Sequence, residues 1–224
     1  QINEWNGNQS PQLIIQDIAT ETIQILDYRS KRKHLQFTEN NSNTAYVIHP
    51  KKDKTNEHHY YYGETIESQY DKVVLRDLPT TMNEIEETLK QLQFSQLYLV
   101  LQHDQSIYFE GMPKMETFKK CFKALATKKE TDLAKEGMQL CQFLNIQPSM
   151  LKFILKVFLD LEFIKDENGI IKMNSVSTKR EIESSKYYQG RLDRIEVEKV
   201  LLYDDFANLK KWIKKLFFKS FGRY

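Results

Sequence analysis

The hydrophobic pattern of this chain changes at Gly111-Met112-Pro113, and this change constrains the fold more than any other feature. Before it, short runs of branched and aromatic residues are separated by turn residues, as in β-strands. After it, apolar residues recur every three or four positions, which is the spacing of one buried helix face. The sequence therefore predicts a strand-rich part followed by a helical part, each long enough to bury a core.

The strand-rich part contains a βαβ pattern. Thr81 and Glu84 form a capping box that predicts a helix from about Met82. A strand precedes this helix and another follows it, so these strands should be parallel with a right-handed connection. We expect an α/β fold in which residues 19–112 form a small Rossmann-like mixed sheet. The expected strands are residues 23–28, 44–49, 59–62, 73–75 and 97–101.

The helical part contains the clearest turn of the sequence, Asn168-Gly169. This pair favours the positive φ angles of a type I′ turn, so two short strands should flank it as a hairpin. Three helices followed by a hairpin is the order of a winged helix. We expect residues 113–224 to form a winged-helix-like domain that ends in a basic helix. Its three helices should start at residue 113, run from about 130 to 144, and run from 149 to 161.

Basic side chains in this predicted domain are candidates for DNA or partner binding. Lys152 and Lys156 are one turn apart on the third helix, which offers no Arg, Asn or Gln for base edges. Asp166 and Glu167 at the wing tip would repel phosphates. The module is therefore either a packing or protein-binding unit or a nonspecific DNA contact. The contact would use Lys152, Lys156, Lys165 and Lys172.

The C-terminal helix has six basic and no acidic residues from position 209 onward. It can be a solvated amphipathic helix docked by apolar residues that include Trp212. It can also contact phosphate backbone or an acidic peptide that ends in an apolar residue. Membrane-surface binding is a weaker alternative, because docking needs the apolar residues. The candidate binding residues are Lys210, Lys211, Trp212, Lys214 and Lys215, whereas Arg29 with residues 31–33 reads as a solvated turn.

No catalytic or metal-binding motif is visible. Phosphate-loop, dinucleotide, zinc-protease and serine-hydrolase patterns are all missing from the sequence. His58 and His59 are adjacent, so in a strand they would point to opposite faces. His103-Asp104 and Arg76-Asp77 read as loop residues without a second acid or base nearby. The sequence thus predicts no catalytic residue and no metal ligand.

The remaining composition fits an intracellular protein. Cys121 and Cys141 lie in apolar helical patterns, which is typical of reduced core thiols in a cytoplasmic protein. No apolar run reaches the roughly 20 residues that span a bilayer. The 33 basic and 31 acidic residues nearly cancel, so bulk charge alone does not argue for nucleic acid. The chain starts at Gln1 and not at Met, so we expect it to be part of a longer polypeptide.

Several segments resemble the RecJ family of single-stranded-DNA-specific exonucleases. The opening Trp5-Asn6-Gly7-Asn8 through Pro11-Gln12-Leu13 resembles the final strand of that family's oligonucleotide-binding (OB) domain, so residues 1–18 would be its remnant strand. The rest resembles the C-terminal domain of RecJ from Gram-positive bacteria. The segments that carry this resemblance are residues 25–29, Asp77-Leu78-Pro79, and residues 153–163 with the following hairpin.

The resemblance implies a non-catalytic accessory domain of a 5′ to 3′ exonuclease in DNA repair and recombination. The Mn or Mg site of such an enzyme lies in upstream motifs that are missing here, so no cofactor is expected in this chain. The implied partners are single-stranded DNA and the acidic, apolar-ended tail of the single-stranded-DNA-binding protein. The alternative is a stand-alone winged-helix regulator that binds DNA.

Overall fold

A computed structural model of the chain describes residues 23–29, 43–66, 69–174 and 180–221, with side chains up to residue 217 in the last helix. These residues form two compact units. The sheet unit comprises Gln1–Gln105 and Val197–Tyr224, and the helical unit comprises Ser106–Glu196. The strand expected within residues 1–18 lies outside the described residues.

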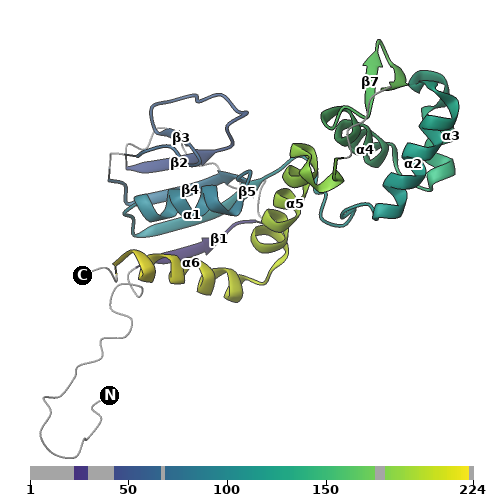
Figure 1. The fold of residues 1–224 in the computed structure, drawn as a ribbon. Helices are drawn as coiled ribbons and strands as arrows, with labels where there is room; N and C mark the ends of the chain where they lie inside the picture. Colours follow the sequence, from purple (N-terminus) through teal and green to yellow (C-terminus); the bar gives the residue numbers. More distant parts are fainter. Residues whose placement is uncertain (1–22, 30–42, 67–68, 175–179, 222–224) are drawn as a thin grey trace, which may run out of the picture. The chain divides into compact units, whose positions relative to one another are not determined.

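The sheet unit is built on five strands in the order β1-β5-β4-β2-β3 (Figure 1). Every neighbouring pair is parallel, so the expectation of a mixed sheet is wrong. The physical reason lies in residues 49–58, which carry the chain from the end of β2 back to the level of its start. Strand β3 therefore runs in the same direction as β2 and does not form a hairpin with it. The strands are β1 (Gln24–Asp27), β2 (Thr44–Ile48), β3 (His59–Tyr61), β4 (Lys72–Asp77) and β5 (Gln96–Gln102).

Helix α1 (Met82–Gln91) connects β4 to β5 and begins where the sequence predicts. The Thr81 hydroxyl accepts a hydrogen bond from the Glu84 amide at 3.3 Å, and the Glu84 carboxylate accepts one from the Thr80 amide at 2.7 Å. These contacts satisfy amides that the first turn leaves unpaired. The helix buries Ile85 and Leu89 completely against one face of the sheet.

Helix α6 (Phe206–Phe221) packs in the same core of the sheet unit, and it contacts α1. Its apolar stripe is buried, and the ring of Phe217 meets that of Phe94 at 5.3 Å. This corrects the expectation that the basic C-terminal helix belongs to the helical domain. The stripe needs an apolar surface to cover, and the sheet supplies it. The buried residues of the stripe are Leu209, Ile213, Leu216 and Phe217.

The helical unit contains the predicted hairpin and one strand that was not predicted. Asn168 and Gly169 have φ angles of 56° and 87°, which confirms the turn. The unexpected strand, β6, pairs antiparallel with β8, so the sheet order is β6-β8-β7. The elements are α2 (Met115–Lys128), β6 (Glu130–Asp132), α3 (Leu133–Leu144), α4 (Pro148–Asp160), β7 (Ile164–Glu167) and β8 (Ile170–Met173).

Both cysteines lie in the core of the helical unit, as expected. Cys121 and Cys141 are 0% and 4% exposed, and both are free thiols. Burial raises the pKa of the Cys121 thiol to about 12 and also raises that of Cys141. Cys121 is therefore a protonated packing residue and not a nucleophile.

The last elements connect the helical unit to α6. A 3-10 turn (Ile182–Ser184) precedes α5 (Lys186–Glu198), which continues into a π-helical segment, Lys199–Tyr203. Across the described ranges, no helix has both the length and the apolar character needed to cross a lipid bilayer.

Candidate functional site

Two of the candidate lysines lie beside a groove on α4. Lys152 and Lys156 are exposed, while most of the helix around them is core. Both border a groove of about 470 Å³ between α3, α4 and the hairpin, together with Asp166. The Lys156 ammonium also lies 5.7 Å from the ring centre of Tyr187. The arrangement can attract an anion, but α4 carries no Arg, Asn or Gln that could read a base edge.

The hairpin lysines are already paired with carboxylates. Lys165 lies 2.7 Å from Glu167, and Lys172 lies 2.9 Å from Glu167 and 3.3 Å from Glu130. Hydrogen bonds from Lys165 and then from Lys172 lower the pKa of Glu167 to about 2. Asp166 accepts a hydrogen bond from the Gly169 amide at 2.8 Å, which shapes the turn. The hairpin therefore offers a phosphate little uncompensated positive charge.

The α6 lysines lie in the other unit. Lys210, Lys211 and Lys215 are exposed, and Lys214 is half-buried. Trp212 is half-buried and packs against the core of the sheet unit, so it is a docking residue there. The candidate residues thus fall into two groups, one in each unit.

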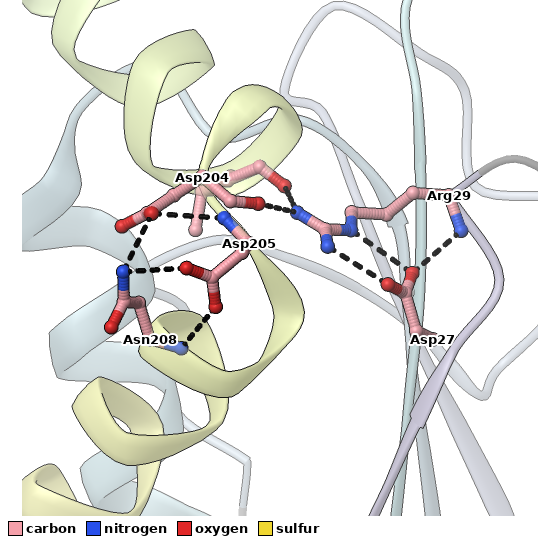
Figure 2. A network of polar contacts seen from close by, with 6 residues as sticks. Asp27, Arg29, Asp204, Asp205 and Asn208 are labelled. Atoms are coloured by element: carbon pink, nitrogen blue, oxygen red, sulfur yellow. Dashed lines mark hydrogen bonds and ion pairs between the residues drawn. The ribbon is translucent and has the colours of Figure 1, made fainter.

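The sequence predicted that Arg29 lies in a solvated turn, and this prediction is wrong (Figure 2). Its side chain is 12% exposed and forms a two-pronged ion pair with Asp27, at 2.9 and 2.8 Å. The guanidinium also donates to the carbonyl oxygens of Leu201 and Asp204, at 2.9 and 3.1 Å. Arg29 therefore fastens the end of β1 to the turn before α6, which is a structural role. Residues 31–33 lie outside the described residues.

The carboxyl edge of the parallel sheet is a frequent location of active sites, and among the described residues it carries a buried carboxylate, Asp77. Asp77 is 2% exposed and pairs with Lys52 at 2.7 Å. The Tyr62 hydroxyl donates to the Asp77 carbonyl at 2.7 Å, and burial raises the pKa of Tyr62 well above its usual value. The Lys52 ammonium therefore balances the charge of the buried Asp77 carboxylate, while the Tyr62 hydroxyl bonds the backbone of Asp77.

His58, His59 and His103 each have different neighbours. The His59 ring faces Tyr46 and the His58 ring faces Tyr70, with ring centres 5.4 and 6.0 Å apart. The adjacent rings thus have different neighbours, as expected for successive residues of a strand. The Nδ1 atom of His103 lies 3.3 Å from the Leu101 carbonyl oxygen. The described residues contain no group of three His, Cys, Asp or Glu that could hold a metal ion.

Sequence reasoning missed a second groove in the helical unit, between α2 and α3. This α2–α3 groove has a volume of about 580 Å³. Phe143 borders it and is 69% exposed. The signal was present, since Phe143 falls outside the α3 face formed by Leu140, Cys141 and Leu144. Its lining also includes Lys120, Lys123, Ala124, Leu125, Thr131 and Glu136.

Comparisons with known proteins give one consistent result. A family model described as "Single-strand DNA-specific exonuclease, C terminal domain" matches residues 24–213. The single-stranded-DNA-specific exonuclease RecJ of Bacillus subtilis is 27% identical over 233 aligned residues. The match covers 96% of this chain but only 29% of that relative's length. No solved structure is significantly similar to the chain.

Proposed function

Because the chain belongs to the family of C-terminal domains of single-strand DNA-specific exonucleases, we propose that it is a non-catalytic accessory domain of such an enzyme. The family match over residues 24–213 is the observation that carries this proposal. The parent enzyme would degrade single-stranded DNA from 5′ to 3′ in repair and recombination in the cytoplasm. This domain would bring DNA or a partner protein to it.

The topology of the helical unit supports a binding role. The order α2-β6-α3-α4-β7-β8, with β6 and β7 flanking β8, supports our proposal that this unit is winged-helix-like. The parallel strand order of the sheet unit similarly supports our proposal that this unit is Rossmann-like. Winged helices often bind DNA through the third helix. Here that helix presents only Lys152 and Lys156 and the hairpin is charge-compensated, which favours sequence-independent contact or protein binding.

The basic row on α6 supports recruitment of an anionic partner. Lys210, Lys211 and Lys215 are exposed, while Leu209, Ile213, Leu216 and Phe217 of the same helix are buried in the core of the sheet unit. A surface of this kind can neutralise a phosphate backbone or the acidic tail of a single-stranded-DNA-binding protein.

The proposed metal, Mn or Mg, would be bound by other parts of the parent enzyme. The described residues do not fit such a site, because they bring no three ligating side chains together. No observation favours the alternative of a stand-alone regulator. A sequence-dependent affinity of the chain for duplex DNA would support that alternative.

The experiment compares the parent exonuclease with a variant in which Lys210, Lys211, Lys214 and Lys215 are changed to Glu. Reversing these charges should weaken binding to single-stranded DNA, most at low salt. It should also reduce the slope of the logarithm of the binding constant against the logarithm of the salt concentration by about 0.7 per lost phosphate contact. The matched control changes the same lysines to Arg, which keeps the charge. Equal affinity of the Glu and Arg variants for both DNA and the acidic tail would contradict recruitment through α6.

A further inference from the structure

The α2–α3 groove contains a buried hydroxyl group that the fold does not use. Thr131, in β6, is 3% exposed and borders the groove. Its Oγ1 has no hydrogen-bond partner among the residues that the structure describes. Strand β6 pairs with β8, with Thr131 opposite Ile171, so the backbone at this position is held in place. Most buried hydroxyls are paired, so an unpaired one in a groove wall suggests a ligand that supplies the missing partner.

The walls of the same groove are largely apolar. Ala124 and Leu125 line it from α2, and Leu140 lines it from α3. Phe143 borders it and is 69% exposed, so much of this ring is available for stacking. The volume of about 580 Å³ is within the range of small-molecule sites. These walls therefore favour a small ligand with a flat aromatic ring.

The charges around the groove leave one lysine uncompensated. Of the three lysines in the lining, Lys128 pairs with Glu136, which also lines the groove. Lys120 pairs with Glu116 at 3.1 Å. Lys123 is exposed, and it forms no ion pair within the described part of the chain. The groove therefore offers one ammonium group to an anion, which suits a single phosphate better than the successive phosphates of a strand.

These features together define the chemistry of the ligand. A purely apolar ligand would fill the groove but would leave the Thr131 hydroxyl unpaired, which costs free energy. A nucleobase has a flat face that stacks on an aromatic side chain and a polar edge that accepts or donates hydrogen bonds. A phosphate on the same molecule can form a charge-assisted hydrogen bond with Lys123. A mononucleotide therefore matches the hydroxyl, the aromatic ring and the lysine at once.

The groove beside Lys152 and Lys156 lacks this combination. It also contains Asp166, whose carboxylate would repel a phosphate. Among the described side chains that line it, none has a buried polar atom without a hydrogen-bond partner. The α2–α3 groove is therefore the better site for a nucleotide.

We propose that the α2–α3 groove binds a free nucleoside monophosphate. The base stacks on Phe143 between the apolar walls, and its polar edge pairs with the Thr131 hydroxyl, which rotation about χ1 can turn toward it. The Lys123 ammonium binds the phosphate. An exonuclease releases nucleoside monophosphates, so in the proposed parent enzyme this site would fill as product accumulates. That consequence rests on the proposed function, whereas the binding itself can be tested on this chain alone.

The test compares three ligands by isothermal titration calorimetry with the 224-residue chain. They are deoxyadenosine 5′-monophosphate, deoxyadenosine, which lacks the phosphate, and deoxyribose 5-phosphate, which lacks the base. We expect the monophosphate to bind at least about tenfold more tightly than either of the others, because only it uses both the aromatic ring and the lysine. Binding of the monophosphate no tighter than that of either partial ligand would overturn the proposal.

Two matched pairs of variants locate the site. Phe143→Ala should weaken binding of the monophosphate by about tenfold, whereas Phe109→Ala, at a residue that is 80% exposed, should not. Lys123→Gln should weaken binding of the monophosphate but not of deoxyadenosine. Lys119→Gln should change neither, since Lys119 lies on the same helix outside the groove lining. All four side chains are exposed, so the variants should fold, and equal effects within either pair would overturn the assignment.

Thr131→Val removes the unpaired hydroxyl at nearly constant shape. It should weaken binding of the monophosphate severalfold while leaving thermal stability equal or higher, which a purely structural hydroxyl would not do. Thr131→Ser keeps the hydroxyl and should retain binding. An unchanged affinity of the Val variant would overturn the proposal, because the unpaired hydroxyl is the observation that points to a ligand.

An oligonucleotide separates a free nucleotide from a nucleotide within a strand. The chain used here has Lys210, Lys211, Lys214 and Lys215 changed to Glu, which removes the basic row on α6. Single-stranded DNA should then bind no more tightly than the monophosphate. Binding that is tighter by about tenfold or more, and that Phe143→Ala abolishes, would overturn the proposal in favour of a DNA strand. Failure of the monophosphate tests would leave the α6 charge-reversal experiment untouched, so the groove and the accessory role can fail separately.

Discussion

The Arg29 guanidinium donates to the carbonyl oxygen of Leu201 at 2.9 Å, although the two residues are 172 positions apart in the sequence. A second bond reaches the Asp204 carbonyl at 3.1 Å (Figure 2). These carbonyls lie at the end of the π-helical segment, where helical amides no longer supply donors. Asp27 holds the guanidinium in place through two further contacts. Arg29 therefore links the first strand to the turn that starts α6.

Replacing Arg29 with Met should lower the free energy of unfolding by about 2 kcal/mol, because two carbonyls and a carboxylate lose a charged donor. Arg29→Lys should cost less but still destabilise, since an ammonium cannot form the two-pronged pair. Urea unfolding followed by circular dichroism measures both. A Met variant as stable as the original chain would show that the link contributes nothing.

The cap of α1 gives a second stability prediction. Thr81→Ala removes the hydroxyl that accepts from the Glu84 amide, and it should cost about 1 kcal/mol. Thr80→Ala is the control, because only the backbone of Thr80 bonds to Glu84. The same unfolding experiment should find the control close to the original. Equal losses for both variants would exclude the cap as the cause.

Two glycines of the helical unit should respond oppositely to alanine. Gly169 has a φ of 87° in the hairpin turn, so Gly169→Ala should destabilise by about 1 kcal/mol or more. Gly190 lies inside α5, and a Cβ added there would meet open space, so Gly190→Ala should stabilise by up to about 1 kcal/mol. Thermal unfolding of the two variants checks the pair, and a shift in the same direction for both would contradict this backbone account.

The hairpin should lose order in acid. Lys165 and Lys172 lower the pKa of Glu167 from its ordinary 4.5 to about 2, so the contribution of this carboxylate to stability is complete above pH 4.5. It should decline as the pH falls toward about 2, when Glu167 becomes protonated. Amide chemical shifts of β7 and β8 measure the change. Glu167→Gln should remove this acid transition, whereas Glu116→Gln on α2 should preserve it.

Features set by neighbouring residues could be predicted from the sequence. The Asn168-Gly169 turn and the start of α1 at Thr81 depend on contacts within a few positions, and both are confirmed. The strands of the sheet were also located closely, since buried parallel strands are short runs of branched residues.

Features that depend on contacts between residues far apart in the sequence could not be predicted. Strand β6 is three residues long and exists because β8 pairs with it, so its residues alone carry no strand pattern. The spacing of α6 revealed its apolar stripe but not that the stripe covers the sheet. Arg29 looked like one of several basic loop residues because its acceptors lie beyond position 200. The α2–α3 groove depends likewise on how two helices and β6 pack.

We propose that this chain assists an exonuclease without performing the cleavage. The most direct measurement follows the hydrolysis of end-labelled single-stranded DNA by the parent enzyme, by the same enzyme lacking the region equivalent to residues 24–213, and by the isolated chain, all with manganese. We expect the truncated enzyme to cleave but to require more DNA for the same rate, and we expect the isolated chain not to cleave. Metal-dependent cleavage by the isolated chain would contradict it.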